Sequence, residues 1–167
     1  GGGYSMDWEP VVDGDFLPTN PVTAGSFAEA GADIPLLIGS NLNEWSGFFE
    51  TDPIEPTEEL TAALRGAYPD KTELTAEQVD TTTIRLPLLK IMSHKADQKA
   101  APVYAYVFTY GNSYHGAEIP YVFNHVSGSG KEQTLGEQVS QTWVNFARKG
   151  VPGTEGMPEW EPYTRES

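Results

Sequence analysis

Two ionisable side chains stand just beyond two apolar runs of the sequence. Glu44 follows the run IPLLIGSN, and His115 lies in a glycine- and asparagine-marked loop after the run APVYAYVFTY. Neither run alternates between apolar and polar residues, which is typical of strands buried on both faces of a parallel sheet. Because catalytic groups gather beyond the carboxyl ends of such strands, the sheet can bring these two side chains together.

A carboxylate beside an imidazole is an arrangement that activates a hydroxyl nucleophile. The carboxylate holds the ring in one tautomer, and the ring removes the proton of the hydroxyl. Glu44 before His115 also fits a chain order of nucleophile, acid and histidine that is found in hydrolases with a parallel sheet. Acids and histidines are common at strand ends, so this spacing alone leaves an ordinary surface histidine as the alternative for His115.

A nucleophile for this pair is missing from the motifs of the sequence. The sharp turn that presents a catalytic serine has glycines two residues before and two residues after it. Ser113 has Gly111 before it but His115 after it, and Ser129 has Ser127 before it. There is no glycine-rich HGGG loop to hold an oxyanion, and GSGK lacks the other residues of a phosphate loop. The chain is therefore predicted not to carry out acyl transfer alone.

The elements that must position the two side chains follow from caps and periodicity. We expect strands over 34–41 and 101–110, a helix over 57–66, and a longer helix that a Thr75–Gln78 capping box opens and that is kinked near Pro87. A second capping box, Thr134 with Glu137, predicts a helix over 134–149 that Gly150 ends. The order strand, helices, strand, helix predicts an α/β fold with parallel strands.

The bulk composition excludes several classes of function. Ten Lys and Arg against 24 Asp and Glu give a net charge of −14, which repels phosphate backbones and anionic lipids. No apolar run approaches the roughly 20 residues that span a bilayer. The chain has no cysteine, which excludes disulfides and thiolate metal sites but leaves its compartment unknown. We therefore expect no nucleic-acid partner and no membrane span.

Five segments carry a more specific signal when they are taken in order. They are PVVDGDFLP, IPLLIGSNLNEWSGFF, PVYAYVFTY, HGAEIPYVF, and TWVNFARKGVPG with the late MPEWEPY, and together they run from Pro10 to Tyr163. This series resembles the C-terminal part of type-B carboxylesterases, the esterase–cholinesterase branch of the α/β-hydrolase fold. The resemblance implies that residues 1–167 are the C-terminal portion of one catalytic domain, with its last parallel strands and closing helix, and not a complete domain.

The resemblance also implies roles for the two ionisable residues. In that family, the glutamate after the LLIG strand is the triad acid and the histidine that opens HG-x-E is the triad base, which are the positions of Glu44 and His115. The family's D-E-G pattern has an acid and a glycine around that glutamate, where this chain has Asn43 and Trp45. The implied activity is the hydrolysis of small, fairly apolar carboxylic esters, without a metal or an organic cofactor.

A partner follows from the same resemblance. The family's serine and oxyanion loop belong to its N-terminal portion, so the expected partner is an N-terminal fragment or chain of the same esterase. Two other classes of protein remain as alternatives. One is a cholinesterase-like adhesion protein without the serine, although the presence of Glu44 and His115 favours the enzyme. The other is a free-standing acidic binding module, which an unpaired strand edge disfavours.

The remaining candidate residues receive structural interpretations. His94 is expected on the solvated surface of a helix, and His125 lies near the site without an acid to orient it. Glu118 is expected to be a surface carboxylate, with a supporting hydrogen bond as the alternative. Three aromatic residues are expected to pack the last helix on the sheet: Trp143, Phe146 and Trp160. Four others divide evenly between the core and an acyl pocket: Phe48, Phe49, Tyr121 and Phe123.

Overall fold

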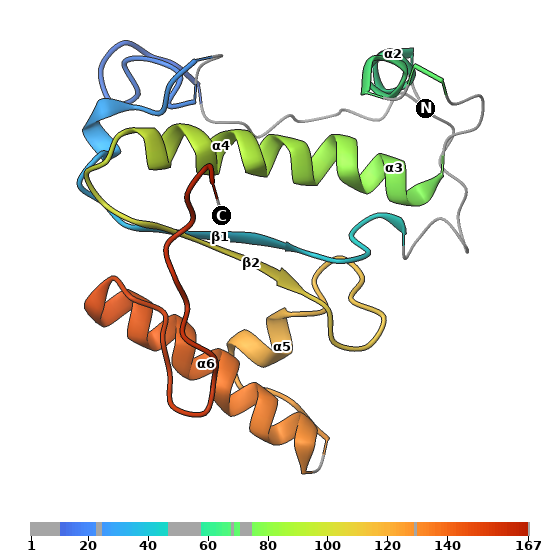
Figure 1. Cartoon of the computed structure of the whole chain (residues 1–167), viewed down its shortest axis with the longest axis vertical. Helices are drawn as coiled ribbons and strands as arrows, with labels where there is room; N and C mark the ends of the chain where they lie inside the picture. The colour runs from blue at the N-terminus through green and yellow to red at the C-terminus, as the bar shows by residue number, and fades with distance from the viewer. Residues whose placement is uncertain are drawn as a thin grey trace, which may run out of the picture.

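A computed structural model describes most of the 167-residue chain. The described residues are 11–22, 25–46, 58–67, 69–70, 75–128 and 130–166. Within these ranges a two-stranded parallel sheet lies between helices on its two sides, with α3 and α4 on one side and α5 and α6 on the other (Figure 1). No helix in the described ranges is long and apolar enough to cross a bilayer.

The two apolar runs form the two strands. β1, Leu36–Asn41, pairs in parallel with β2, Val103–Phe108, over all 6 residues of each strand. Gly39 is required in this pairing, because a Cβ there would overlap the backbone oxygen and the ring of Tyr106. The predicted parallel strands are therefore confirmed, and their carboxyl ends point toward the same edge of the sheet.

A long helical segment runs along one side of the sheet. It consists of α3 (Ala76–Asp80), a π-helical turn (Thr81–Arg85) and α4 (Leu86–Asp97). The predicted capping box is present before it: the Thr75 N–H donates to Gln78 Oε1 at 2.9 Å, and the Gln78 N–H donates to Thr75 Oγ1 at 3.3 Å. The π-helical turn ends directly before α4, whose first turn contains Pro87, and the predicted kink near Pro87 stays a prediction.

Lys95 ties α4 to the segment that leads into β1. Its side chain is only 1% exposed, and Nζ donates to the backbone oxygens of Gly31 at 2.6 Å and Ala32 at 2.7 Å. These residues lie at the end of a short 3-10 helix, Glu29–Gly31. Burial lowers the pKa of the Lys95 ammonium, and the charge of Asp33 opposes this effect. The contact fixes the chain four residues before β1 begins.

The prediction for His94 is wrong. The residue is half-buried, and its Nδ1 is enclosed without a hydrogen-bond partner in the described part of the chain. His94 lies three residues after the half-buried Ile91 and directly before the buried Lys95. Residues three apart share one face of a helix, so His94 lies at the edge of the buried face of α4 and not on its solvated face.

The other side of the sheet carries α6, Lys131–Lys149, which confirms the predicted closing helix but not its start. The helix begins three residues earlier than predicted, after Gly130, whose φ of 64° is in the left-handed region. The Thr134 hydroxyl donates to the Gly130 oxygen at 3.1 Å inside the first turn, so Thr134 and Glu137 do not form a capping box. At the other end, Gly150 adopts a left-handed φ of 71° as its C-cap.

Aromatic side chains hold α6 and the C-terminal segment against the sheet. The ring of Trp143 meets Tyr106 edge-on at 5.1 Å, and Phe146 meets Tyr104 at 6.2 Å. Trp160 donates its indole N–H to a β2 backbone oxygen at 3.0 Å. The predicted packing role of the three aromatic residues is confirmed. Two further helices within the described ranges are α2 (Glu58–Ala67), which confirms the predicted helix over 57–66, and α5 (Ile119–Val122).

Candidate active site

Glu44 and His115 are 71 residues apart in the sequence and meet beyond the ends of β1 and β2. His115 Nδ1 and Glu44 Oε2 are separated by 2.6 Å, which is short even for a charge-assisted hydrogen bond. The side chain of Glu44 is 10% exposed and that of His115 is 55% exposed. The carboxylate is therefore enclosed while the ring remains accessible. With Nδ1 bound to Glu44, Nε2 is the ring nitrogen left for a reacting hydroxyl.

The loops that carry this pair continue the pairing of the strands. The Asn43 N–H donates to the Ser113 oxygen at 3.1 Å, and the His115 N–H donates to the Glu44 oxygen at 3.1 Å. Between these bonds, Asn43 and Tyr114 form a parallel bridge. The backbones on either side of Glu44 and His115 are thus hydrogen-bonded to each other directly, in addition to the side-chain contact.

Ser113 is a turn residue and not a nucleophile. It is buried and adopts a left-handed φ of 46°. Its hydroxyl donates to the Tyr110 oxygen at 3.0 Å. The enclosed hydroxyl stabilises the turn that leads to His115. This agrees with the lack of a serine elbow around it in the sequence.

The second oxygen of Glu44 is also held. The Asn41 N–H donates to Glu44 Oε1 at 2.8 Å, so the carboxylate bridges the end of β1 and the imidazole. The Asn41 side chain donates to the Tyr114 oxygen at 3.0 Å and to Glu118 Oε2 at 2.5 Å. The surface-carboxylate interpretation of Glu118 is therefore wrong: the turn after His115 folds Glu118 back over the end of β1, where it makes a supporting hydrogen bond.

Trp45 and Asp80 complete the surroundings of the pair. The indole of Trp45 stacks on the imidazole of His115, with ring centroids 4.7 Å apart and planes inclined by 19°. Asp80, at the end of α3, is 1% exposed and accepts the Trp45 N–H at 2.6 Å. It also accepts the Ser46 N–H at 3.2 and 3.3 Å through its two oxygens. The buried carboxylate thus anchors the turn directly after Glu44.

Comparisons with known proteins decide the family. The model of the carboxylesterase family matches residues 55–167. The chain belongs to the carboxylesterase family. Para-nitrobenzyl esterase of Bacillus subtilis is 27% identical over 98% of this chain and 39% of its own length. Human bile salt-activated lipase is 30% identical over 98% of this chain and 28% of its own length. The chain thus spans well under half of either relative.

Solved carboxylesterase structures share the fold. A carboxylesterase of Geobacillus stearothermophilus matches with a TM-score of 0.71 and 29% identity, over 98% of this chain and 40% of that one. A structure titled PNB esterase matches with a TM-score of 0.68 and 26% identity, over 83% of this chain and 34% of that one. This carboxylesterase chain therefore has part of an α/β-hydrolase fold, as the sequence predicts.

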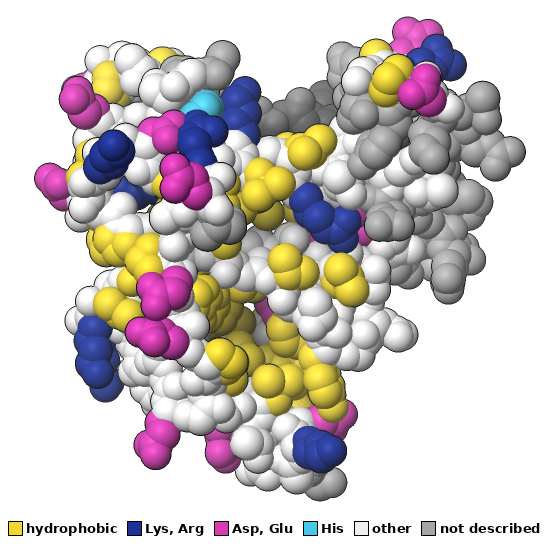
Figure 2. Space-filling model, in the orientation of Figure 1, with side chains coloured by type: hydrophobic (Ala, Val, Ile, Leu, Met, Phe, Trp, Pro, Cys, Tyr) yellow, Lys and Arg dark blue, Asp and Glu magenta, His cyan; other side chains and the backbone are white. Residues whose placement is uncertain are grey.

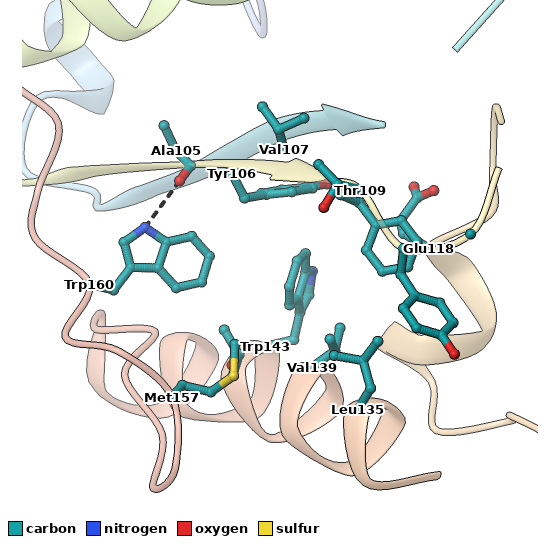
Figure 3. A pocket seen from close by; sticks show the side chains of 14 residues that line it. Ala105, Tyr106, Val107, Thr109, Glu118, Leu135, Val139, Trp143, Met157 and Trp160 are labelled. Carbon is teal, nitrogen blue, oxygen red and sulfur yellow. Dashed lines mark hydrogen bonds between the residues drawn. The ribbon is translucent and has the colours of Figure 1, made fainter. Parts of the chain in front are cut away.

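A cleft of about 540 Å³ opens between β2 and α6 of the carboxylesterase chain (Figure 3). It is mostly apolar, and its walls include Tyr106, Leu135, Val139, Trp143, Met157 and Trp160. Burial, followed by the charges of Glu118 and Glu44, raises the pKa of Tyr106 to about 12. Neither Glu44 nor His115 lines the cleft, but Glu118 does, and it is bonded to the Asn41 side chain beside Glu44.

The described aromatic candidates contact other aromatic rings. Tyr121 packs against Phe108 at 5.2 Å and Tyr110 at 5.6 Å, which favours the core over an acyl pocket. Phe123 is exposed and lies 6.5 Å from the ring of the exposed His125. Phe48 and Phe49 lie outside the described residues. Asp80 was not predicted as part of the site from the sequence. The only feature of the sequence that could have pointed to Asp80 is an acid at the end of a capped helix.

Proposed function

We propose that the protein containing this chain hydrolyses carboxylic esters through an acyl-serine intermediate. His115 acts first as base and then as acid, and Glu44 holds its ring and stabilises the imidazolium. The single observation that carries the proposal is the 2.6 Å contact of the enclosed Glu44 carboxylate with His115 Nδ1. With Nδ1 bound, Nε2 of the accessible His115 ring is the nitrogen that can accept the proton of the serine. The proposed substrates are small, fairly apolar esters.

The reaction follows from this arrangement. The serine oxygen attacks the ester carbonyl carbon while its proton passes to His115 Nε2, and donors of an oxyanion loop hold the negative oxygen. The intermediate collapses, the alkoxide leaves, and it takes the proton from Nε2. Water then attacks the acyl-serine by the same proton transfers and releases the acid. In both acylation and deacylation, the Glu44 carboxylate faces the His115 ring and stabilises it while the ring carries the transferred proton.

The serine and the oxyanion loop are proposed to come from an N-terminal portion of the same esterase, in the same polypeptide or a companion chain. The chain spans 39% of the length of para-nitrobenzyl esterase, which leaves room for such a portion. Apolar side chains also gather around an exposed hollow of the surface (Figure 2). Covering about 400 Å² of such surface would contribute about 10 kcal/mol, which is comparable with the stability of a domain.

Exposed apolar residues on both sides of the sheet fit this interpretation. Val107 is on β2, Leu86 and Leu89 are on α4, and Ile119 is on α5, and all four are exposed. An N-terminal portion packed on them would form an interface that resembles a domain core. Purified alone, the 167 residues are expected to be inactive, and adding the N-terminal portion is expected to restore turnover. Ester hydrolysis by the isolated chain would contradict this part of the proposal.

The substitution His115→Ala in the complete protein tests the reaction itself. Hydrolysis of a para-nitrophenyl ester is expected to fall by about 10⁴-fold or more, as for other members of a triad. His125→Ala removes an exposed histidine outside the pair and is the matched control, with an expected change of less than about twofold. A loss of tenfold or less in the first variant would remove His115 from the mechanism. A complete wild-type protein without ester hydrolysis would instead favour a binding protein.

A further inference from the structure

We propose that Trp45 is a positioning residue of this site, whose indole fixes the plane of the His115 ring and stabilises that ring while it carries the serine proton. The inference rests on the proposed function and assigns a role to a residue that the triad chemistry does not require. It starts from the stacked contact, in which the ring centroids are 4.7 Å apart and the planes are inclined by 19°.

The hydrogen bond to Glu44 cannot fix the imidazole alone. It holds one ring atom, Nδ1, at 2.6 Å from the carboxylate oxygen and leaves rotation about the line between the two atoms. Such a rotation swings Nε2, at the far side of the ring, away from the nucleophile. A flat ring against the face of the imidazole opposes the swing. Reactions of this kind are sensitive to displacements of about 1 Å, so this restraint favours turnover.

Trp45 is itself held from inside the protein. Its backbone N–H donates to Asp80 Oδ1 at 2.6 Å, and the next residue, Ser46, donates to the same carboxylate. Asp80 is 1% exposed, and Glu44, directly before Trp45, is bonded at both carboxylate oxygens. The indole therefore extends from a backbone that is fixed by hydrogen bonds on both sides of the Glu44–Trp45 peptide.

The stack also discriminates between the two charge states of the ring. When His115 takes the serine proton, it becomes a cation that lies against the π face of an indole, and such contacts are attractive. The attraction is present in the transition state and is weaker for the neutral ring, so it accelerates the reaction. For a half-exposed ring the expected gain is about 3- to 30-fold, which is about 0.6–2 kcal/mol at 1.36 kcal/mol per decade.

The effect is expected to modulate turnover rather than decide it. The pattern of the family has a glycine at the position of Trp45, so the chemistry proceeds without an aromatic residue there. The tryptophan is a feature of this chain. A loss of several decades on its removal would therefore indicate damage to Glu44 or His115, and not the loss of a stacked ring.

The test compares Trp45→Phe with Trp45→Leu in the complete protein. Both variants are smaller and apolar, but only phenylalanine keeps a π face. We expect W45L to lower kcat for a para-nitrophenyl ester by about 3- to 30-fold with little change in KM, and W45F to retain most of kcat. The ring protons of His115, assigned by their loss in H115A, are expected to move downfield in W45L. They should move less in W45F.

Each other outcome overturns the inference. Equal kcat for the wild type, W45F and W45L, or an equal loss in both variants, excludes a role of the π face. A rise in KM alone makes Trp45 a substrate contact. If W45L melts below the assay temperature, Trp45→Met takes its place against W45F. If H115A retains activity, the proposed function fails, whereas failure of the Trp45 inference alone leaves H115A inactive.

Discussion

The substitution Glu44→Gln removes the negative charge of the side chain and keeps its size and shape. Oε1 of Glu44 accepts the Asn41 N–H at 2.8 Å, and Oε2 lies 2.6 Å from His115 Nδ1. In E44Q the single amide oxygen of the glutamine keeps accepting the backbone N–H of Asn41, because this N–H needs an acceptor. The NH₂ group then faces Nδ1, which must become the acceptor. The proton of the neutral ring moves to Nε2, the nitrogen that should receive the serine proton.

The magnitude follows from that tautomer. A ring protonated at Nε2 cannot act as base, and the corresponding substitution in a serine-protease triad lowers kcat by about 10⁴-fold. That is about 5.4 kcal/mol at 1.36 kcal/mol per decade. Because the Glu44 side chain is only 10% exposed, a substrate has little access to it. KM is therefore expected to change little, and the fold to remain intact.

Steady-state hydrolysis of a para-nitrophenyl ester by the complete protein measures this effect, together with a thermal melt. Glu137→Gln removes the same charge from an exposed position of α6 and serves as control, with activity expected within about twofold of the wild type. If E44Q retained activity within tenfold of the wild type while H115A was inactive, the Glu44 carboxylate would not set the tautomer of His115.

Two further predictions concern stability. Lys95→Met removes the hydrogen bonds of the ammonium to the Gly31 and Ala32 oxygens and to Gln98 Oε1, and it is expected to lower the free energy of unfolding of the complete protein by about 1–3 kcal/mol. Lys90→Met, at an exposed position of α4, should change that free energy by less than about 0.5 kcal/mol. Equal denaturant midpoints for the two variants would contradict this prediction. The raised pKa of Tyr106, about 12, keeps its phenol protonated in the folded state while the unfolded state ionises near 10, so stability is lost as pH rises from 10 to 12. Tyr106→Phe should flatten this part of the pH–stability curve, and identical slopes for the two proteins would exclude Tyr106 as the cause.

The strands and the proximity of Glu44 and His115 could be predicted because their signals are local. A strand buried on both faces leaves an uninterrupted apolar run, and two such runs in parallel bring the residues after them to one edge. Thr75 and Gln78 could be predicted as a cap for the same reason. Thr134 shows the limit, because its residue type fits a cap or a helix interior equally well. The left-handed Gly130 places the helix start before it.

Contacts between distant elements have no such signal. The hydrogen bonds of Asp80 depend on how α3 approaches the turn after β1, and those of Glu118 depend on how the turn after His115 folds back. Trp45 could be identified as a departure from the family pattern, but not as a ring stacked on His115. These contacts depend on angles and distances between elements, which periodicity and residue type do not encode.

The pairing of β1 with β2 has a consequence for refolding. Helices α4 and α6 form from local contacts, whereas the two strands must find each other across a long stretch of chain, and parallel pairing of this kind is slow. The bond between Glu44 and His115 spans 71 residues and depends on that pairing. Recovery of ester turnover after denaturation should therefore lag behind the far-ultraviolet helix signal. Activity would then report the completion of the sheet rather than the formation of its helices.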